Sequence, residues 1–189
     1  AYKEKYPTVK HFNLRTMVKQ TIASFNSRAE RRNIHIGMTF GAQLPEIYRG
    51  DEKRLKTVLR NIISNGLKFT ESGSVHVYVD GRLKGADEVE LRITIKDTGT
   101  GMPRDVMARV FNRFEQANGM TYQQSAGRGN GLAIAREYIN FMGGDIGVES
   151  QVGEGSKFEI SLTLHVAEGL NVSLPPDPHS TPALSANQA

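Results

Sequence analysis

Apolar residues recur along the chain at two spacings, every three to four residues in some stretches and every second residue in others. The longer spacing is typical of amphipathic helices, and it follows a good N-cap residue at Asn13 and again at Asp51. We expect helices after both residues, and a third helix from Leu132 to the glycine pair at 143–144. Their apolar stripes would consist of Leu14, Met17, Val18, Ile22 and Phe25, then Leu55, Val58, Leu59, Ile62 and Ile63, then Ile134, Tyr138, Ile139 and Met142.

The shorter spacing is typical of half-buried strands. It covers residues 34–39, 75–80 and 89–95, and we expect two further strands near 146–149 and 158–166. The linker around Gly85 is short, which favours an antiparallel pair at 75–80 and 89–95. Because helices and hairpins alternate irregularly, the pattern predicts a two-layer α/β (α+β) sandwich. In this fold, helices cover one face of a mostly antiparallel mixed sheet.

The length and the end of the chain set the expected domain organisation. A chain of 189 residues can bury one ordinary core and is too short for two. Its last twenty or so residues contain Pro175, Pro176, Pro178 and Pro182 among Ser, Asn and Ala. We therefore expect one domain at 12–166, followed by a disordered Pro-rich tail at 167–189.

Composition narrows the functional classes. The chain has a net charge of +4 but scatters its basic residues among nearly as many acidic ones, so no basic groove for nucleic acid is predicted. It contains no cysteine, which fits a reducing compartment. It also shows no apolar run of the roughly 18 residues that a membrane span needs, and no signal peptide. We expect a soluble domain.

Candidate chemistry begins on the second expected helix. Asn61, Asn65 and Lys68 stand at i, i+4 and i+7, so they share one helix face beside the apolar stripe. An Asn carbonyl oxygen can complete the octahedral shell of Mg²⁺, and Lys68 can balance phosphate charge. Taken alone, the same residues fit an ordinary solvated helix face.

Two glycine-containing segments follow. Asp97 ends an alternating strand and precedes Gly99 and Gly101, where a tight turn lets the backbone approach a flat ligand. The glycines of 127–131 precede the third expected helix, whose N-terminal amides can receive phosphate oxygens. In isolation, the first segment fits a plain Asp-Thr-Gly turn and the second a flexible linker. Between these two segments, Phe111 and Phe114 fit the core of a short helix. Arg113 fits a phosphate or partner contact and an ordinary surface arginine equally well.

The order and the residue types of these four segments resemble the N, G1, F and G2 boxes of the ATP-binding domain of sensor histidine kinases. The resemblance runs from about Phe12 to Val166, within the wider GHKL (Bergerat-fold) ATPase superfamily. That superfamily also includes type II topoisomerases, mismatch-repair ATPases and a heat-shock chaperone. The Lys68-Phe69-Thr70 ending and the paired phenylalanines are similar to the kinase branch. The resemblance implies a Bergerat fold with a mobile ATP lid within 103–126, and ATP and Mg²⁺ as cofactors.

The resemblance also implies roles for single residues. Asn65 would coordinate the metal. Asn61 would make an additional metal contact or bind the groups that surround the metal, and Asn61 and Lys68 would serve catalysis. Asp97 would accept the adenine amino hydrogen, because an ionised carboxylate only accepts hydrogen bonds. The implied ATP-binding set is Asn61, Asn65, Lys68, Asp97, Gly99, Gly101, Arg113, Phe114, Gly127, Arg128, Gly129, Gly131 and Leu132.

The chain departs from the family pattern at three positions. Asn130 stands where leucine is usual, Arg128 where a small residue is usual, and Gly66 where alanine is usual. Gly66 should weaken its helix by up to about 1 kcal/mol. The loss of an apolar lid anchor at Asn130 bears on turnover more than on binding, and Arg128 adds positive charge near the phosphates.

We expect the chain to bind Mg²⁺-ATP and to transfer the γ-phosphoryl group to a histidine on a separate dimerisation hairpin, as in a sensor or hybrid sensor histidine kinase. Topoisomerase-type relatives carry a water-activating glutamate where Asn61 stands, so transfer to an external nucleophile is favoured over rapid hydrolysis. In this family the phosphoacceptor histidine is followed by an acidic residue and then by Thr-Pro. None of the five histidines of the chain stands in such a sequence: His11, His35, His76, His165 and His179. Residues 1–11 would then end a linker from that hairpin.

The resemblance further implies a downstream response-regulator receiver domain as partner, a monomeric chain and a homodimeric full-length protein. We expect a cytoplasmic location, including the case of the cytoplasmic part of a membrane-attached receptor. Two other functions stay open at this point. One is a pseudokinase or receptor module that binds nucleotide or a partner and signals by conformation. The other is a DNA-linked ATPase clamp, which the missing glutamate argues against.

Overall fold

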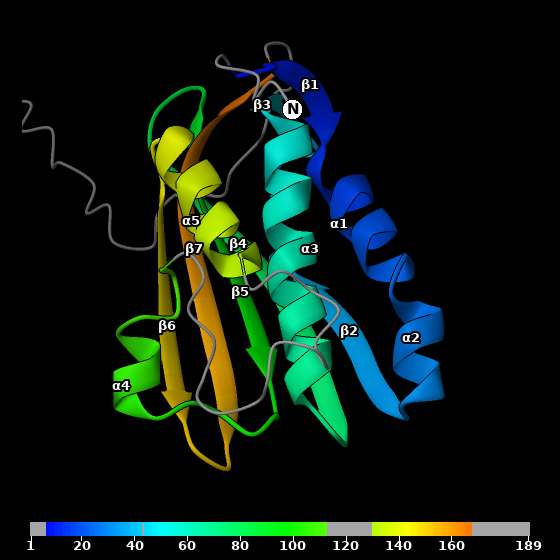
Figure 1. Cartoon of the computed structure of the whole chain (residues 1–189). Coiled ribbons are helices and arrows are strands. Elements are labelled where there is room, and N and C mark those ends of the chain that lie inside the picture. Colours follow the sequence, from blue (N-terminus) through cyan, green and yellow to red (C-terminus); the bar gives the residue numbers. More distant parts are fainter. Residues whose placement is uncertain (1–6, 43, 113–129, 168–189) are drawn as a thin grey trace, which may run out of the picture.

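Seven strands form one sheet in the part of the chain that the computed structural model describes, residues 7–42, 44–112 and 130–167 (Figure 1). The strand order is β1-β3-β7-β5-β4-β2, and β6 pairs with β7. The strands are β1 Lys10–Asn13, β2 Ile34–Phe40, β3 Ile47–Gly50, β4 Gly73–Leu83, β5 Glu88–Asp97, β6 Asp145–Gln151 and β7 Gly155–Val166.

All strand pairs are antiparallel except β2 with β4, so the sheet is mixed and mostly antiparallel, as the alternation predicts. The long strands β4, β5 and β7 lie side by side at its centre. At the end of β5, Asp97 pairs with Val75 of β4 on one side and with Ser156 of β7 on the other. This register places Asp97 in the middle of the sheet rather than at its edge.

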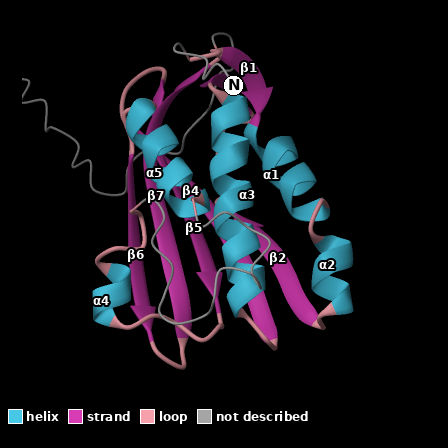
Figure 2. Cartoon of the chain, viewed as in Figure 1, coloured by secondary structure: helices cyan, strands magenta, loops and turns pink. Residues whose placement is uncertain are grey.

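Helices cover one face of the sheet, as Figure 2 shows, and this confirms the expected two-layer arrangement. Asn13 accepts a hydrogen bond from the Thr16 amide and Asp51 accepts one from the Arg54 amide, so both predicted N-caps are present. The helices are α1 Leu14–Ala23, α2 Asn26–Arg31, α3 Glu52–Phe69, α4 Arg104–Met107 and α5 Gly131–Phe141.

The core lies between the two layers. The apolar residues of the expected stripes on α1 and α3 are buried, as are the inward residues of β4 and β5. On the opposite face of β4, Tyr78 is exposed and His76 is half-buried. The α5 helix ends where Gly143 takes a φ of +76°, and the Gly144 amide bonds back to the Ile139 carbonyl.

Three short elements were not predicted: β1, β3 and α2. A four-residue strand is too short to show alternation, and the six residues of α2 bury Ala29 alone. Their partners are distant in sequence, since β1 pairs with β3 and β3 with the end of β7. The expected tail from residue 168, the start of the expected linker at 1–6 and the lid residues from 113 onward lie outside the described residues.

No helix in the described ranges is long and apolar enough to cross a membrane.

Candidate nucleotide-binding site

The polar face of α3 is present as predicted. Asn61 and Asn65 are half-buried and Lys68 is exposed, while the apolar stripe of the same helix is buried against the sheet. The Nδ2 atom of Asn61 is buried and has no hydrogen-bond partner among the described residues. A buried amide group of this kind calls for a partner, because leaving it unpaired costs free energy. Asn61 therefore has hydrogen-bonding capacity to offer a ligand.

The start of α5 lies against Asn61. A Cβ on Gly131, the first residue of α5, would stand 3.5 Å from the Cγ and Oδ1 atoms of Asn61. The N-terminal amides of this eleven-residue helix thus begin beside the polar face of α3. The Leu132 side chain is buried in the core, so only its backbone is suited to meet a ligand. This arrangement brings the N-terminus of α5, the end of a helix that can attract anions, next to Asn61 on the polar face of α3.

Asp97 is held in one orientation at the end of β5. The residue is 5% exposed, and its Oδ1 atom accepts hydrogen bonds from the amides of Gly99 at 2.9 Å and Ser156 at 3.2 Å. Burial raises the pKa of the Asp97 carboxyl above its ordinary value, although the two amides act in the opposite direction. Since both amides bind Oδ1, the carboxylate has a second oxygen for another donor.

The glycine turn after Asp97 fits tightly between two other segments. A Cβ on Gly99 would stand 2.5 Å from the Phe69 carbonyl oxygen, and Gly101 has a φ of +65°. These positions therefore need glycine. The Thr100 amide donates to the Phe69 carbonyl, and the Thr100 carbonyl accepts from the Gly153 amide. The turn thereby connects the end of α3 to the hairpin between β6 and β7.

Gly66 explains how α3 comes so close to Asp97. A Cβ at this position would lie 3.3 Å from both methyl groups of Val75 and 3.5 Å from the Asp97 Cβ. The glycine is buried, so it permits a close approach between helix and sheet as well as lowering helix propensity. The turn of α3 that carries Asn65 and Gly66 therefore packs next to Asp97.

The structure adds residues that the sequence interpretation missed. The amide of Ser156 orients Asp97, and the Ser156 hydroxyl lies 3.0 Å from that of Ser150. The Ser150 hydroxyl also donates to the Gly155 carbonyl and accepts from the Met102 amide. The Thr98 hydroxyl accepts from the Ser74 amide. The Gly153-Glu-Gly155 turn is visible in the sequence and predicts a hairpin there. It does not predict that this hairpin contacts the end of β5.

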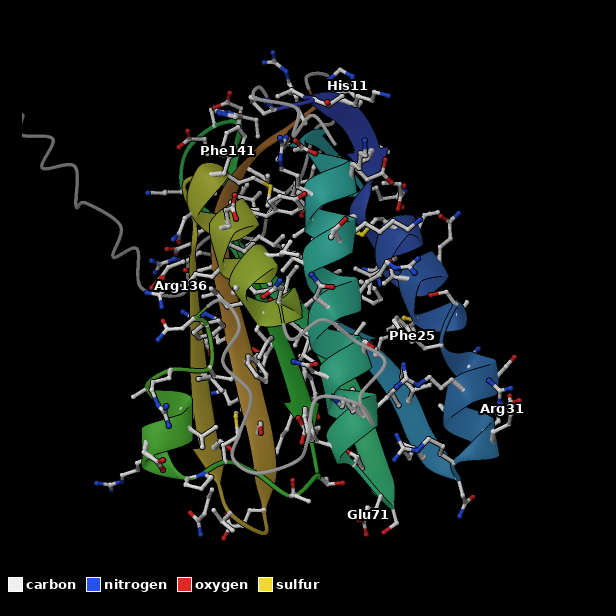
Figure 3. The ribbon with its side chains drawn as sticks, viewed as in Figure 1. His11, Phe25, Arg31, Glu71, Arg136 and Phe141 are labelled. Atoms are coloured by element: carbon white, nitrogen blue, oxygen red, sulfur yellow. The ribbon has the colours of Figure 1, made fainter. Side chains whose placement is uncertain are left out.

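Other predicted site residues lie outside the described residues: Arg113, Phe114, Gly127, Arg128 and Gly129. Phe111 packs edge-on against Phe158 with ring centroids 6.2 Å apart, and the Arg136 guanidinium lies 5.4 Å from the centre of the Phe111 ring. Figure 3 labels Arg136 on α5. Phe111 therefore acts as a packing residue. A shallow polar hollow on β6 and β7, lined by Asp145, Glu149, Lys157 and Glu159 among others, includes none of the candidate residues.

Comparison with known proteins identifies the family of this chain. Residues 50–166 match the family described as histidine kinase-, DNA gyrase B-, and HSP90-like ATPase. The matched region includes α3, Asp97 with its glycine turn, α5 and β7. The chain belongs to this family, and the kinase branch within it is indicated by the relatives.

Among these relatives, the sensor histidine kinase AruS of Pseudomonas aeruginosa is 34% identical over 170 residues, which are 90% of this chain and 17% of AruS. The sensor histidine kinase GacS of Pseudomonas protegens is 37% identical over 153 residues, 81% of this chain and 17% of GacS. The chain thus spans about a sixth of these curated relatives. It is a histidine kinase-type ATPase domain like those that sensor kinases carry.

Solved structures show the same fold. Full-length ShkA in complex with AMPPNP superposes with a TM-score of 0.74 and 28% identity, over 87% of this chain and 33% of ShkA. The nucleotide-free catalytic domain of the histidine kinase ThkA superposes with a TM-score of 0.64 and 22% identity, over 82% of this chain and 97% of that domain. The second comparison concerns the fold alone.

Proposed function

We propose that this domain binds Mg²⁺-ATP and transfers the γ-phosphoryl group to a histidine on a dimerisation hairpin outside this chain. The observation that carries the proposal is the buried Asp97 carboxylate, oriented by two backbone amides and next to the turn of α3 that carries Asn65. An acceptor-only group at this place favours the adenine amino group over the carbonyl that guanine carries there. The ShkA relative, with AMPPNP in its complex, supports a nucleotide as ligand.

The described residues fit the phosphate end of ATP and its metal ion. Asn61 and Asn65 offer amide oxygens of the kind that Mg²⁺ accepts, and the unpaired Asn61 Nδ2 can donate to a phosphate oxygen. Lys68 supplies a positive charge, and α5 supplies the amides at its N-terminus. Bound Mg²⁺ would neutralise charge on the phosphates. We assign metal binding to Asn65 with Asn61, and phosphate contacts to Lys68 and Gly131.

Asn61 favours transfer of the γ-phosphoryl group over hydrolysis of ATP. An asparagine cannot remove a proton from water as a glutamate does, so the α3 face offers no general base there. The proposed acceptor is the hairpin of the same protein, and the proposed later partner is a response-regulator receiver domain. Arg113, Phe114, Gly127, Arg128 and Gly129 are proposed to complete the site from the segment between α4 and α5.

A phosphotransfer assay tests this proposal. The chain is mixed with Mg²⁺, ATP labelled on the γ-phosphate, and the dimerisation hairpin of the longer protein that contains it. We expect acid-labile, alkali-stable label on the hairpin, and none on a hairpin whose acceptor histidine is replaced by glutamine. Asn65→Ala should slow transfer about 100-fold or more, because a metal contact supplies several kcal/mol to the transition state. Nucleotide binding without labelling would instead establish a module that signals by conformation.

A further inference from the structure

The sheet face opposite the helices carries two imidazoles that the nucleotide site does not use. His35 lies on β2 and His76 on β4, which are neighbouring parallel strands. In this register Gly37 stands directly beside His76, and His35 beside Ser74. Because side chains alternate along a strand, His35, Gly37 and His76 all belong to the outer face. His35 is exposed and His76 is half-buried.

Gly37 leaves a small space that one nitrogen from each ring borders. A Cβ on Gly37 would stand 2.9 Å from His76 Nδ1 and 3.3 Å from His35 Nε2. Both nitrogens therefore approach the same point above the glycine. The His76 ring occupies part of the room that a side chain at position 37 would need, so this glycine permits the pairing.

Neighbouring groups fix the orientation of His76. Its Nε2 atom lies 2.8 Å from the Thr39 hydroxyl, and its ring packs against Tyr78 with centroids 4.4 Å apart. A ring that donates from Nε2 to Thr39 presents the lone pair of Nδ1 to the space above Gly37. Burial, and secondarily His35, lowers the pKa of His76, so its imidazole is neutral at neutral pH. Neutral imidazole is the form that binds metal ions.

We propose that His35 Nε2 and His76 Nδ1 form a site for one divalent transition-metal ion, Cu²⁺ or Zn²⁺, on the outer face of the sheet. Imidazole suits these metals, and the nitrogen–metal distance of about 2.0 to 2.1 Å requires the two rings to close over Gly37. The exposure of His35 leaves its side chain free to make this movement. Water completes the coordination shell.

Two features set the strength and preference of this site. No cluster of three or more His, Cys, Asp or Glu side chains suited to a metal occurs in the described part of the chain, so the described residues contribute two ligands. Lys96 is the cross-strand neighbour of His76 and opposes a cation by its charge. Both features weaken binding, and we therefore expect Cu²⁺, the strongest binder of the divalent series, to bind more tightly than Zn²⁺.

The site can be tested by titrating the nucleotide-free chain with Cu²⁺ or Zn²⁺ alone in a calorimeter. We expect His35→Gln and His76→Gln each to weaken binding at least tenfold. Gly37→Ala keeps both imidazoles but places a methyl group between them, so it should weaken binding similarly. His165→Gln is the matched control, because His165 lies on β7 near Asp87 and Glu88 and should not affect this site.

Zinc titration followed by imidazole nitrogen NMR provides a second reading, with shifts expected at His35 Nε2 and His76 Nδ1. ATP affinity of the His35→Gln and Gly37→Ala variants should equal that of the parent chain, which separates this site from the nucleotide site. Equal metal affinity in the parent, His35→Gln and His76→Gln chains would overturn the proposal. A loss of binding confined to His165→Gln would overturn it as well.

Discussion

Asp97 combines its proposed role in recognition with a cost to stability. Burial raises the pKa of its carboxyl, with the amides of Gly99 and Ser156 only partly offsetting that effect. A raised pKa in the folded state means that the unfolded chain releases this proton at a lower pH. The contribution of Asp97 to stability is therefore fully present below the unfolded pKa of about 3.9 and is lost as pH rises through the folded value.

Replacing this carboxylate should consequently stabilise the empty domain. Asp97→Asn retains an Oδ1 atom that can accept from both amides, but it removes the buried charge. We expect a higher free energy of unfolding than the parent at neutral pH, and a difference that shrinks as pH falls toward about 4. Urea unfolding at both pH values measures this.

Asp80→Asn provides the comparison, because Asp80 is exposed on the same sheet. Its free energy of unfolding should stay within about 0.5 kcal/mol of the parent. If Asp97→Asn were less stable than the parent at every pH, the hydrogen bonds of the carboxylate would outweigh its burial.

The sequence predicts the chemistry of single residues better than their surroundings. The helical spacing of Asn61, Asn65 and Lys68 is visible in the sequence because it is local. One of the two amides that orient Asp97 comes from Ser156, which is distant in sequence. A backbone amide of this kind cannot be predicted from the pattern of side chains. The contact of Gly131 with Asn61 likewise depends on tertiary packing. The assigned roles of these residues in binding and catalysis stay predictions.

At the scale of elements, α2 secures the end of α3 that carries the candidate site. The Arg32 guanidinium, directly after α2, donates to the carbonyls of Leu67 and Thr70, the latter at 3.0 Å. Arg28 donates to the Ser64 hydroxyl at 3.2 Å. The two Arg32 bonds satisfy carbonyls that the end of a helix leaves unpaired, and a positive charge is favourable there. Arg32 is therefore a positioning residue for Asn65 and Lys68.

Arg32→Ala should lower the free energy of unfolding by about 1 to 2 kcal/mol, because charged hydrogen bonds to two carbonyls are lost. It should also weaken ATP binding several-fold, since the end of α3 becomes less ordered. Arg31→Ala is the control: Arg31 is exposed on α2 and is labelled in Figure 3. Chemical unfolding and ATP titration of both variants give the comparison. Equal losses in the two variants would contradict a positioning role.

Element prediction succeeded where local signals were strong. The caps Asn13 and Asp51 and the apolar stripes marked α1 and α3, and alternation marked β2, β4 and β5. It failed for α2, whose stability depends on contacts such as Arg32 with α3, and for β1 and β3. Those strands form because distant segments pair, and a periodicity argument cannot detect pairing over such distances.

In the whole molecule, the two layers give the sheet two different faces. On the helix-covered side, Gly66 lets α3 pack against Asp97, and Gly131 lets the start of α5 lie against Asn61. On the outer side, His35 and His76 meet over Gly37. Val75, which precedes His76 on β4, pairs with Asp97 of β5, so β4 links the two sites. The fold thus separates a proposed nucleotide site from a proposed metal site by one sheet thickness.

The most direct test of the central claim is a calorimetric titration of ATP with Mg²⁺ into the unaltered chain and into Asp97→Asn. We predict one ATP per chain, with affinity reduced about 10- to 100-fold in the variant. That reduction corresponds to the loss of about 1.5 to 3 kcal/mol from a charged hydrogen bond to adenine. GTP should bind the unaltered chain weakly, because Asp97 has no donor for the guanine carbonyl. Failure of the unaltered chain to bind ATP, or equal affinity of both chains, would contradict the account.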